Sequence, residues 1–242
     1  MKPRKEMYHK LLWGWQWVIS ESLSPIRAQI IYGIFMQSLH TAGDVAEFGC
    51  YEGHTSRELA TYLKYNVPHK NLHVFDSFMG LNNPGEHDIT DKEADLIKAT
   101  NYVQGLKDGQ EYICQGSFED VRDGFIEAKL HNVLLYQGYF DEWKDDFKED
   151  LCFALIDADL YESTRSAIEI AKPLISPGGV IVFDDYGADK FWPGVKKAVD
   201  EVFAEDPEWD LMCMGSEPVW LASAWRRRVW HKPLVVEEVR DE

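Results

Sequence analysis

Residues 44–65 read DVAEFGCYEGHTSRELATYLKY and form the first of several strand–helix units. A short apolar strand is expected at 45–48, then a turn with two glycines and a helix over about 55–65. Further apolar runs have the length of strands: 72–75, 133–136, 152–156 and 180–183. Helices are expected over about 161–172 and 193–203. Short apolar strands that alternate with helices predict a doubly wound α/β fold, with a mostly parallel sheet covered on both faces.

The C-terminal part of the sequence departs from this alternation. Apolar segments at 209–214 and 218–222 flank the turn residues 215–217, which predicts an antiparallel β-hairpin at the end of the sheet. Ser176-Pro177-Gly178-Gly179 predicts a turn before the strand at 180–183.

The chain is expected to contain one α/β domain over 43–225, with an N-terminal helical arm over 1–42 and a C-terminal tail over 226–242. Ser24 and Pro25 predict the start of a helix in the arm. Before them, tryptophans stand at every second position, an awkward pattern for an isolated helix: Trp13, Trp15 and Trp17. This segment is interpreted as a packing arm, with a lid over the substrate as the alternative.

Composition and charge exclude several classes of protein. The chain has 242 residues and a formal net charge of −17, from 42 acidic and 25 basic residues. This balance argues against nucleic-acid binding and against a polybasic membrane anchor, because both need basic surfaces. The apolar runs are too short to cross a bilayer, and no signal peptide is recognised. Four scattered cysteines without a CxxC pair indicate reduced thiols, so we expect a cytoplasmic protein.

The first strand carries Glu47 near its end, and the turn after it carries Gly49 and Gly53. Two glycines at this spacing let the backbone approach a ligand closely between strand and helix. A dinucleotide-binding GxGxxG motif would need glycine where Tyr51 stands, which disfavours a dehydrogenase. An acidic residue followed by these glycines suits S-adenosylmethionine, with an ordinary strand–helix turn as the alternative.

Two later strand ends add features expected of a nucleotide site. Asp76 ends the second strand, where an acidic side chain can accept hydrogen bonds from both ribose hydroxyls. The alternative for Asp76 is the N-cap of a helix. Gly138, Tyr139 and Phe140 follow the third strand, and the two rings are expected to lie against adenine unless they belong to the core.

Acidic residues gather after the last two parallel strands. Asp157 and Asp159 follow one strand, and Asp184 and Asp185 follow the next. Because both strand ends open on one edge of the sheet, Asp157, Asp184 and Asp185 are expected to face one crevice. Grouped carboxylates repel unless a cation lies between them, and an all-oxygen set favours Mg²⁺, Mn²⁺ or Ca²⁺ over zinc. The alternative is that these aspartates cap the helices that follow.

Together these motifs resemble the macrocin-type sugar O-methyltransferases, a family of metal-dependent class I S-adenosylmethionine-dependent enzymes. The resemblance is carried by DSFMGL at 76–81, GYF at 138–140, DADLYEST at 157–164 and DDYG at 184–187. It covers roughly residues 40–205, and DADLYEST is its most specific part. The sequence departs from the family's GVWRG motif, which reads GCYEG here.

The resemblance implies a Rossmann-like class I methyltransferase fold, whose mostly parallel seven-stranded sheet ends in the antiparallel hairpin. It implies cofactor-binding roles for these residues: Glu47, Gly49, Gly53, Asp76, Ser77, Gly138, Tyr139 and Phe140. It implies a Mg²⁺ or Mn²⁺ site at Asp157, Asp184 and Asp185, with Asp157 as the favoured catalytic base. The expected partner is a small-molecule hydroxyl acceptor, a sugar or a glycoside.

The expected reaction is methyl transfer from S-adenosylmethionine to a hydroxyl that a divalent metal coordinates, since a bound cation lowers the pKa of that hydroxyl. Two alternatives stay open. A catechol- or caffeoyl-type O-methyltransferase acting on an aromatic diol is disfavoured because Leu160 stands where those enzymes carry lysine. A non-catalytic adenosylmethionine-binding subunit would have no need of the acidic cluster.

Two further segments are expected to shape the acceptor site or the assembly. The long polar stretch between Leu81 and Gly116 follows a strand end, where an active-site lid would lie, and His87 within it is an outside candidate for the base. The aromatic residues of the N-terminal arm predict a homo-oligomer.

Overall fold

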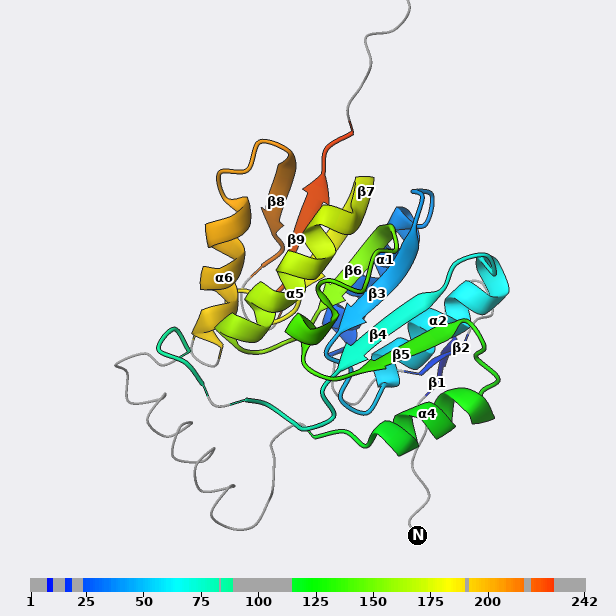
Figure 1. The fold of residues 1–242 in the computed structure, drawn as a ribbon. Helices are drawn as coiled ribbons and strands as arrows, with labels where there is room; N and C mark the ends of the chain where they lie inside the picture. Colours follow the sequence, from blue (N-terminus) through cyan, green and yellow to red (C-terminus); the bar gives the residue numbers. More distant parts are fainter. Residues whose placement is uncertain are drawn as a thin grey trace, which may run out of the picture.

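The computed structural model describes these parts of the chain: residues 24–82, 84–88, 115–189, 192–215 and 219–228, and the backbone of 8–10 and 16–18. Its centre is a seven-stranded sheet with the strand order β5-β4-β3-β6-β7-β9-β8 (Figure 1). The strand bounds are β3 Asp44–Phe48, β4 Leu72–Asp76, β5 Val133–Gln137, β6 Leu151–Ile156, β7 Ile175–Phe183, β8 Trp209–Cys213 and β9 Ala222–Arg226. Neighbours from β5 to β7 are parallel, and β9 runs antiparallel to β7 and β8. The expected fold class, with its terminal antiparallel hairpin, is confirmed.

The strand order reverses between β3 and β6, because the chain adds β4 and β5 on one side of β3 and β6 and β7 on the other. Phe48 at the end of β3 lies opposite Phe75 of β4 and Ile156 of β6, and Ile156 lies opposite Phe183 of β7. These four strands therefore end at one level of the sheet. Ligands of open α/β sheets bind at such a switch point, beyond the carboxyl ends of the strands.

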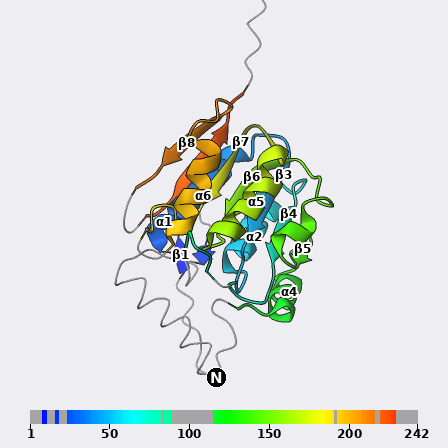
Figure 2. The same cartoon turned by 60° about the vertical axis from the view of Figure 1, so that its left-hand side comes forward.

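Helices cover both faces of the sheet. The helix bounds are α1 Pro25–Ser38, α2 His54–Asn66, α4 Phe118–Glu127, the 3₁₀ turn η1 Phe140–Trp143, α5 Tyr161–Leu174 and α6 Pro193–Phe203. Buried side chains of α1, α2 and α4 form one hydrophobic core with the sheet, and those of α5 and α6 form a second core on the opposite face. Figure 2 shows α5 and α6 side by side on their face. None of the described helices is long and apolar enough to span a membrane.

The start of α1 agrees with the sequence. Ser24 is the N-cap, its side chain accepts a hydrogen bond from the Arg27 amide at 3.4 Å, and Pro25 is the first helical residue. The expectation of a helical arm over 1–42 is wrong at two places, because Tyr8–Lys10 and Gln16–Val18 pair as antiparallel strands β1 and β2. Of the three tryptophans, Trp17 lies in β2, and Trp13 and Trp15 lie outside the described residues.

Several other boundaries differ from the sequence-based expectation. Residues 176–179 are a bulge inside β7 rather than a turn before it, since Leu151 pairs with Ile175 and Phe153 with Val180. The second hairpin strand begins at Ala222, four residues later than expected. Helix α4 was not expected from the sequence.

Three expected segments lie outside the described residues in whole or in large part. They are 89–114 of the insertion after Leu81, the tail after Arg228, and the arm around Trp13 and Trp15. The described stub of the insertion, 84–88, is bonded to α5: Asp88 Oδ1 accepts a hydrogen bond from the Tyr161 amide at 2.7 Å. The chain leading into the insertion is thereby tied to the helix that follows β6.

Candidate functional site

A cavity of about 770 Å³ opens at the carboxyl ends of β3 to β7. Its lining includes nearly every residue that the sequence proposed for a site: Glu47, Gly49, Asp76, Ser77, Gly138, Tyr139, Phe140, Asp157, Asp184 and Asp185. Among the proposed cofactor and metal residues, Gly53 alone is not in the lining. The strand ends that share one level of the sheet therefore bring the two groups of proposed residues into one space.

Gly49 turns the chain away from β3 where another strand end leaves no room for a side chain. Its φ is 88°, and a β-carbon at this position would lie 1.9 Å from the carbonyl oxygen of Asp157. Gly53 has a φ of 69° and is the N-cap residue of α2, where a β-carbon would lie 3.0 Å from Val121 Cγ1. Gly53 therefore allows the start of α2 to pack on α4 and does not line the cavity.

Glu47 is a buried acidic residue near the end of β3, with an exposed fraction of 2%. Ser56 Oγ donates a hydrogen bond to its Oε2 atom. Burial raises the pKa of Glu47 to about 8, the Ser56 hydrogen bond opposes this, and the charge of Asp76 adds to it. A cationic group of a ligand placed beside Glu47 would stabilise its ionised form.

Asp76 organises the turn after β3. Its Oδ2 accepts hydrogen bonds from the amides of Cys50 at 2.8 Å and Tyr51 at 3.1 Å, and its Oδ1 accepts one from the Phe78 amide at 2.8 Å. No helix begins after Asp76 in the described chain, so the alternative of a helix N-cap is not observed. Ser77 Oγ accepts a hydrogen bond from the Met79 amide at 3.1 Å and closes the turn that follows.

The three residues after β5 all line the cavity, and one of them also packs on the core. Gly138 has a φ of 138°, and Tyr139 beside the cavity is 43% exposed. The ring of Phe140 packs edge-to-face on Phe48, with 5.6 Å between centroids. Phe140 thus lines the cavity and also extends the core, whereas the Tyr139 ring is accessible to a ligand.

The carboxylates of Asp157, Asp184 and Asp185 converge: one oxygen of each lies within 4.8 Å of the others. Backbone bonds past the strand ends hold them there, from the Asp157 amide to Phe48 O at 2.9 Å and from the Asp184 amide to Ile156 O at 3.0 Å. The crevice expected from the sequence is therefore formed by the tertiary structure.

Burial and mutual repulsion dominate the electrostatics of this group. Burial, followed by the charge of Asp184, raises the pKa of Asp157 well above its usual range. Burial and then the charge of Asp185 raise the pKa of Asp184 to about 6, against the opposing effect of Arg27. Carboxylates in this condition bind a proton or a cation readily, and three oxygen ligands fit a hard divalent cation.

Three non-glycine residues that line the cavity have strained backbone conformations. Tyr51, Asp159 and Asp185 line it and have φ angles of 50°, 59° and 56°, in the left-handed region that few non-glycine residues adopt. Such conformations persist where surrounding structure enforces them, and they concentrate at functional sites.

Arg27 lines the cavity and contacts its carboxylates, and the sequence did not indicate it. Its Nε donates to Asp184 Oδ1 at 2.9 Å and its Nη2 donates to Asp185 Oδ1 at 3.1 Å. Burial by itself lowers the pKa of Arg27, but Asp184, Asp185 and Asp157 outweigh it, so the pKa is raised. No motif could have indicated this contact, because Arg27 and Asp184 are 157 positions apart in the sequence.

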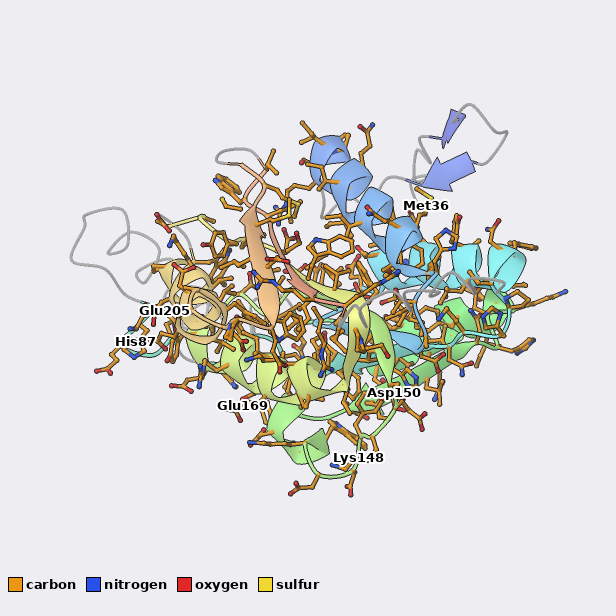
Figure 3. All side chains as sticks on the ribbon, turned by 90° about the horizontal axis from the view of Figure 1, so that it is seen from above. Met36, His87, Lys148, Asp150, Glu169 and Glu205 are labelled. Atoms are coloured by element: carbon orange, nitrogen blue, oxygen red, sulfur yellow. The ribbon has the colours of Figure 1, made fainter. Side chains whose placement is uncertain are left out.

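His87 has no place in this site. Its ring packs on that of Tyr161 with 4.4 Å between centroids, and it is not among the residues that line the cavity. Figure 3 shows His87 at the edge of the molecule. The suggestion that His87 is the base is therefore not supported by its position.

The family model described as macrocin-O-methyltransferase (TylF) matches residues 29–210. A relative from Streptomyces olivaceus, 8-demethyl-8-(2,3-dimethoxy-alpha-L-rhamnosyl)-tetracenomycin-C 4'-O-methyltransferase, is 28% identical over 61% of this chain and 54% of its own length. The demethyldecarbamoylnovobiocin O-methyltransferase of Streptomyces niveus is 28% identical over 67% of this chain and 59% of its own length. The matches thus span less than two thirds of either relative.

Among solved structures, that of the O-methyltransferase NovP has a TM-score of 0.66 and 26% sequence identity. The match covers 84% of this chain and 80% of that chain. The fold class and the family resemblance expected from the sequence are both confirmed.

Proposed function

Because the chain belongs to the macrocin-O-methyltransferase family, we propose that it transfers a methyl group from S-adenosylmethionine to a hydroxyl of a sugar or glycosylated small molecule. The observation that carries this proposal is the single cavity that Glu47 and Asp76 share with the carboxylates of Asp157, Asp184 and Asp185. A cofactor site and a cation site side by side are what a metal-assisted methyl transfer requires.

The cofactor would lie over the ends of β3, β4 and β5. Glu47 would accept a hydrogen bond from the ammonium group, and Asp76 would accept hydrogen bonds from the ribose hydroxyls. Tyr139 would present its exposed ring to adenine. The absence of a side chain at Gly49 would let the cofactor approach the backbone beside Asp157.

Asp157, Asp184 and Asp185 would hold Mg²⁺ or Mn²⁺, and the bound ion would lower the pKa of a coordinated acceptor hydroxyl. Asp157 would receive the hydroxyl proton, since burial and then the charge of Asp184 raise the pKa of its carboxyl. The acceptor oxygen forms the new bond to the methyl carbon as the S–CH₃ bond breaks. The electron pair of that bond stays on sulfur, which loses its positive charge.

Three observations favour a hydroxylated glycoside over an aromatic diol as the acceptor. The first turn and a half of α5 contributes polar side chains to the cavity, among them Glu162, Ser163 and Ser166, which can form hydrogen bonds with sugar hydroxyls. Leu160 is buried, and it stands at the position where the catechol-type enzymes are expected to carry lysine. The acceptor named for the relative from Streptomyces olivaceus also contains a rhamnosyl group.

The test is a transfer assay with methyl-labelled S-adenosylmethionine, Mg²⁺ or Mn²⁺, and a panel of glycosides, free sugars and catechols. We expect label in a glycoside, loss of transfer with EDTA, and recovery when the ion is restored. Transfer at full rate in EDTA would exclude the metal role, and label in catechols alone would favour the aromatic alternative. Cofactor binding without transfer to any acceptor class would favour a non-catalytic subunit.

The homo-oligomer stays a prediction, which light scattering of the purified chain tests.

A further inference from the structure

Arg27 is the one cationic side chain among the described residues that line the cavity. It lies in the first turn of α1, which Ser24 caps, and its side chain is 12% exposed. From this position the guanidinium reaches across to the turn after β7. Its place in the site is therefore determined by the packing of α1 against the sheet.

The guanidinium bridges two of the proposed metal ligands. Nη2 donates to Asp185 Oδ1 at 3.1 Å and also contacts Asp184 Oδ1, to which Nε donates at 2.9 Å. Asp184 Oδ1 accepts a further hydrogen bond from the Asp185 amide at 3.0 Å. This oxygen therefore has three donors, and it has no room for an additional ligand while Arg27 is in place.

A divalent cation between Asp184 and Asp185 would need the same space. Such an ion lies about 2.0–2.6 Å from each oxygen that it binds. A guanidinium nitrogen that bridges the same two carboxylates would then be in direct contact with the ion, and like charges at this separation repel strongly in a buried site.

We propose that Arg27 occupies the cation site between Asp184 and Asp185 in the metal-free protein and gives up these oxygens when the ion binds. This inference rests on the proposed metal centre. Arg27 is then a positioning residue: it holds converging carboxylates together before the ion arrives, and it lowers the affinity for the ion by competing with it. The incoming ion must therefore displace the positive charge of Arg27 from these carboxylates.

The test is the affinity of the full-length, cofactor-free chain for Mn²⁺ alone, measured by the electron paramagnetic resonance signal of the free ion. Arg27→Gln removes the competing charge and is expected to lower the Kd for Mn²⁺ at least tenfold. Arg27→Lys keeps the charge and is expected to remain within threefold of wild type. The matched control is Arg165→Gln. Arg165 lies on α5, its Nη2 is 3.8 Å from Glu169 Oε1, and it does not line the cavity. Its Kd is expected to stay within twofold of wild type.

The outcomes separate this inference from the proposed function. Equal or weaker Mn²⁺ binding by Arg27→Gln, with wild type binding Mn²⁺, would overturn the competition and leave the metal centre standing. Absence of Mn²⁺ binding in wild type and in both Arg27 variants would overturn both. Circular dichroism checks the fold, and Arg27→Met replaces the glutamine variant in the same comparison if that variant does not fold.

Discussion

The α-carbon of Gly49 faces the carbonyl oxygen of Asp157 so closely that a β-carbon on Gly49 would lie 1.9 Å from that oxygen. The turn after β3 and the end of β6 are therefore packed backbone against backbone. This contact sets the distance between the proposed cofactor half of the cavity, at Glu47 and Asp76, and the carboxylates beyond β6 and β7.

Gly49→Ala is expected to weaken the binding of both S-adenosylmethionine and Mn²⁺, because the methyl group forces the two strand ends apart. The left-handed backbone, with a φ of 88°, adds strain of about 1–3 kcal/mol to the folded state. Calorimetry for both ligands and thermal unfolding measure these effects. Gly33→Ala is the control, since Gly33 lies in α1 with nothing within 4 Å of its added β-carbon. Ligand affinities equal to wild type in Gly49→Ala would contradict the proposed contact.

Asp157→Asn and Asp185→Asn are each expected to lower the rate of methyl transfer by at least about 10²-fold, because each removes a charged oxygen from the cation site and Asp157→Asn also removes the base. Affinity for S-adenosylmethionine should stay within about twofold, measured by calorimetry without metal. Asp210→Asn is the control: Asp210 lies on β8 and pairs with Arg227 at 2.6 Å, on the surface. Full transfer activity in either site variant would remove that residue from the mechanism.

Glu47 makes the stability of the ligand-free protein depend on pH. Burial, against the hydrogen bond from Ser56, raises its pKa from 4.5 to about 8, so between these values the folded chain binds a proton that the unfolded chain lacks. The contribution of Glu47 to the free energy of unfolding therefore falls as pH rises from 4.5 to 8, by roughly 3–5 kcal/mol in total. Glu47→Gln should show a shallower fall across this window in urea unfolding. An identical pH dependence in the two proteins would show that Glu47 is already ionised in the fold.

The raised pKa of Glu47 leads to a second prediction, that cofactor binding releases protons. The ammonium group of S-adenosylmethionine would favour ionised Glu47, so binding at pH 7 is expected to release up to about one proton. Binding enthalpies measured in two buffers with different ionisation enthalpies give this number directly. Glu47→Gln should bind more weakly and should release fewer protons. Buffer-independent enthalpies in wild type would place the ammonium group elsewhere.

Asp88 caps α5 from outside the helix. Its Oδ1 accepts from the Tyr161 amide at 2.7 Å, and its Oδ2 accepts from the Gly85 amide at 2.8 Å, whereas the N-cap residue Leu160 offers no side-chain bond. Asp88→Ala is expected to lower the free energy of unfolding by about 1 kcal/mol, as the loss of an N-cap does. Urea unfolding measures this. Glu86→Ala, at a neighbouring side chain that is 87% exposed, should change stability by less than about 0.5 kcal/mol. Equal stability of Asp88→Ala and wild type would mean that the cap has no energetic role.

Most residues of the cavity could be predicted from the sequence because the signal for each of them is local. A carboxylate that directly follows an apolar strand must lie at the carboxyl edge of a parallel sheet, and this rule brought Asp76, Asp157 and Asp184 to one edge. Residues 8–10 and 16–18 differ from the expectation, because an arm expected to be helical contains paired strands there. The bulge at 176–179 was not expected either, because a shift in pairing depends on the neighbouring strand β6.

The sequence alone predicted the parallel strands, most of the helices, the family, and the acidic residues at the strand ends, since these follow from apolar periodicity and short motifs. Only the tertiary structure decided how close the carboxylates come and which cation they meet. One oxygen of each lies within 4.8 Å of the others because β6 and β7 pair in a register that ends them together. Arg27 joins them because α1 packs across the sheet, and a contact over 157 residues has no signature in either segment.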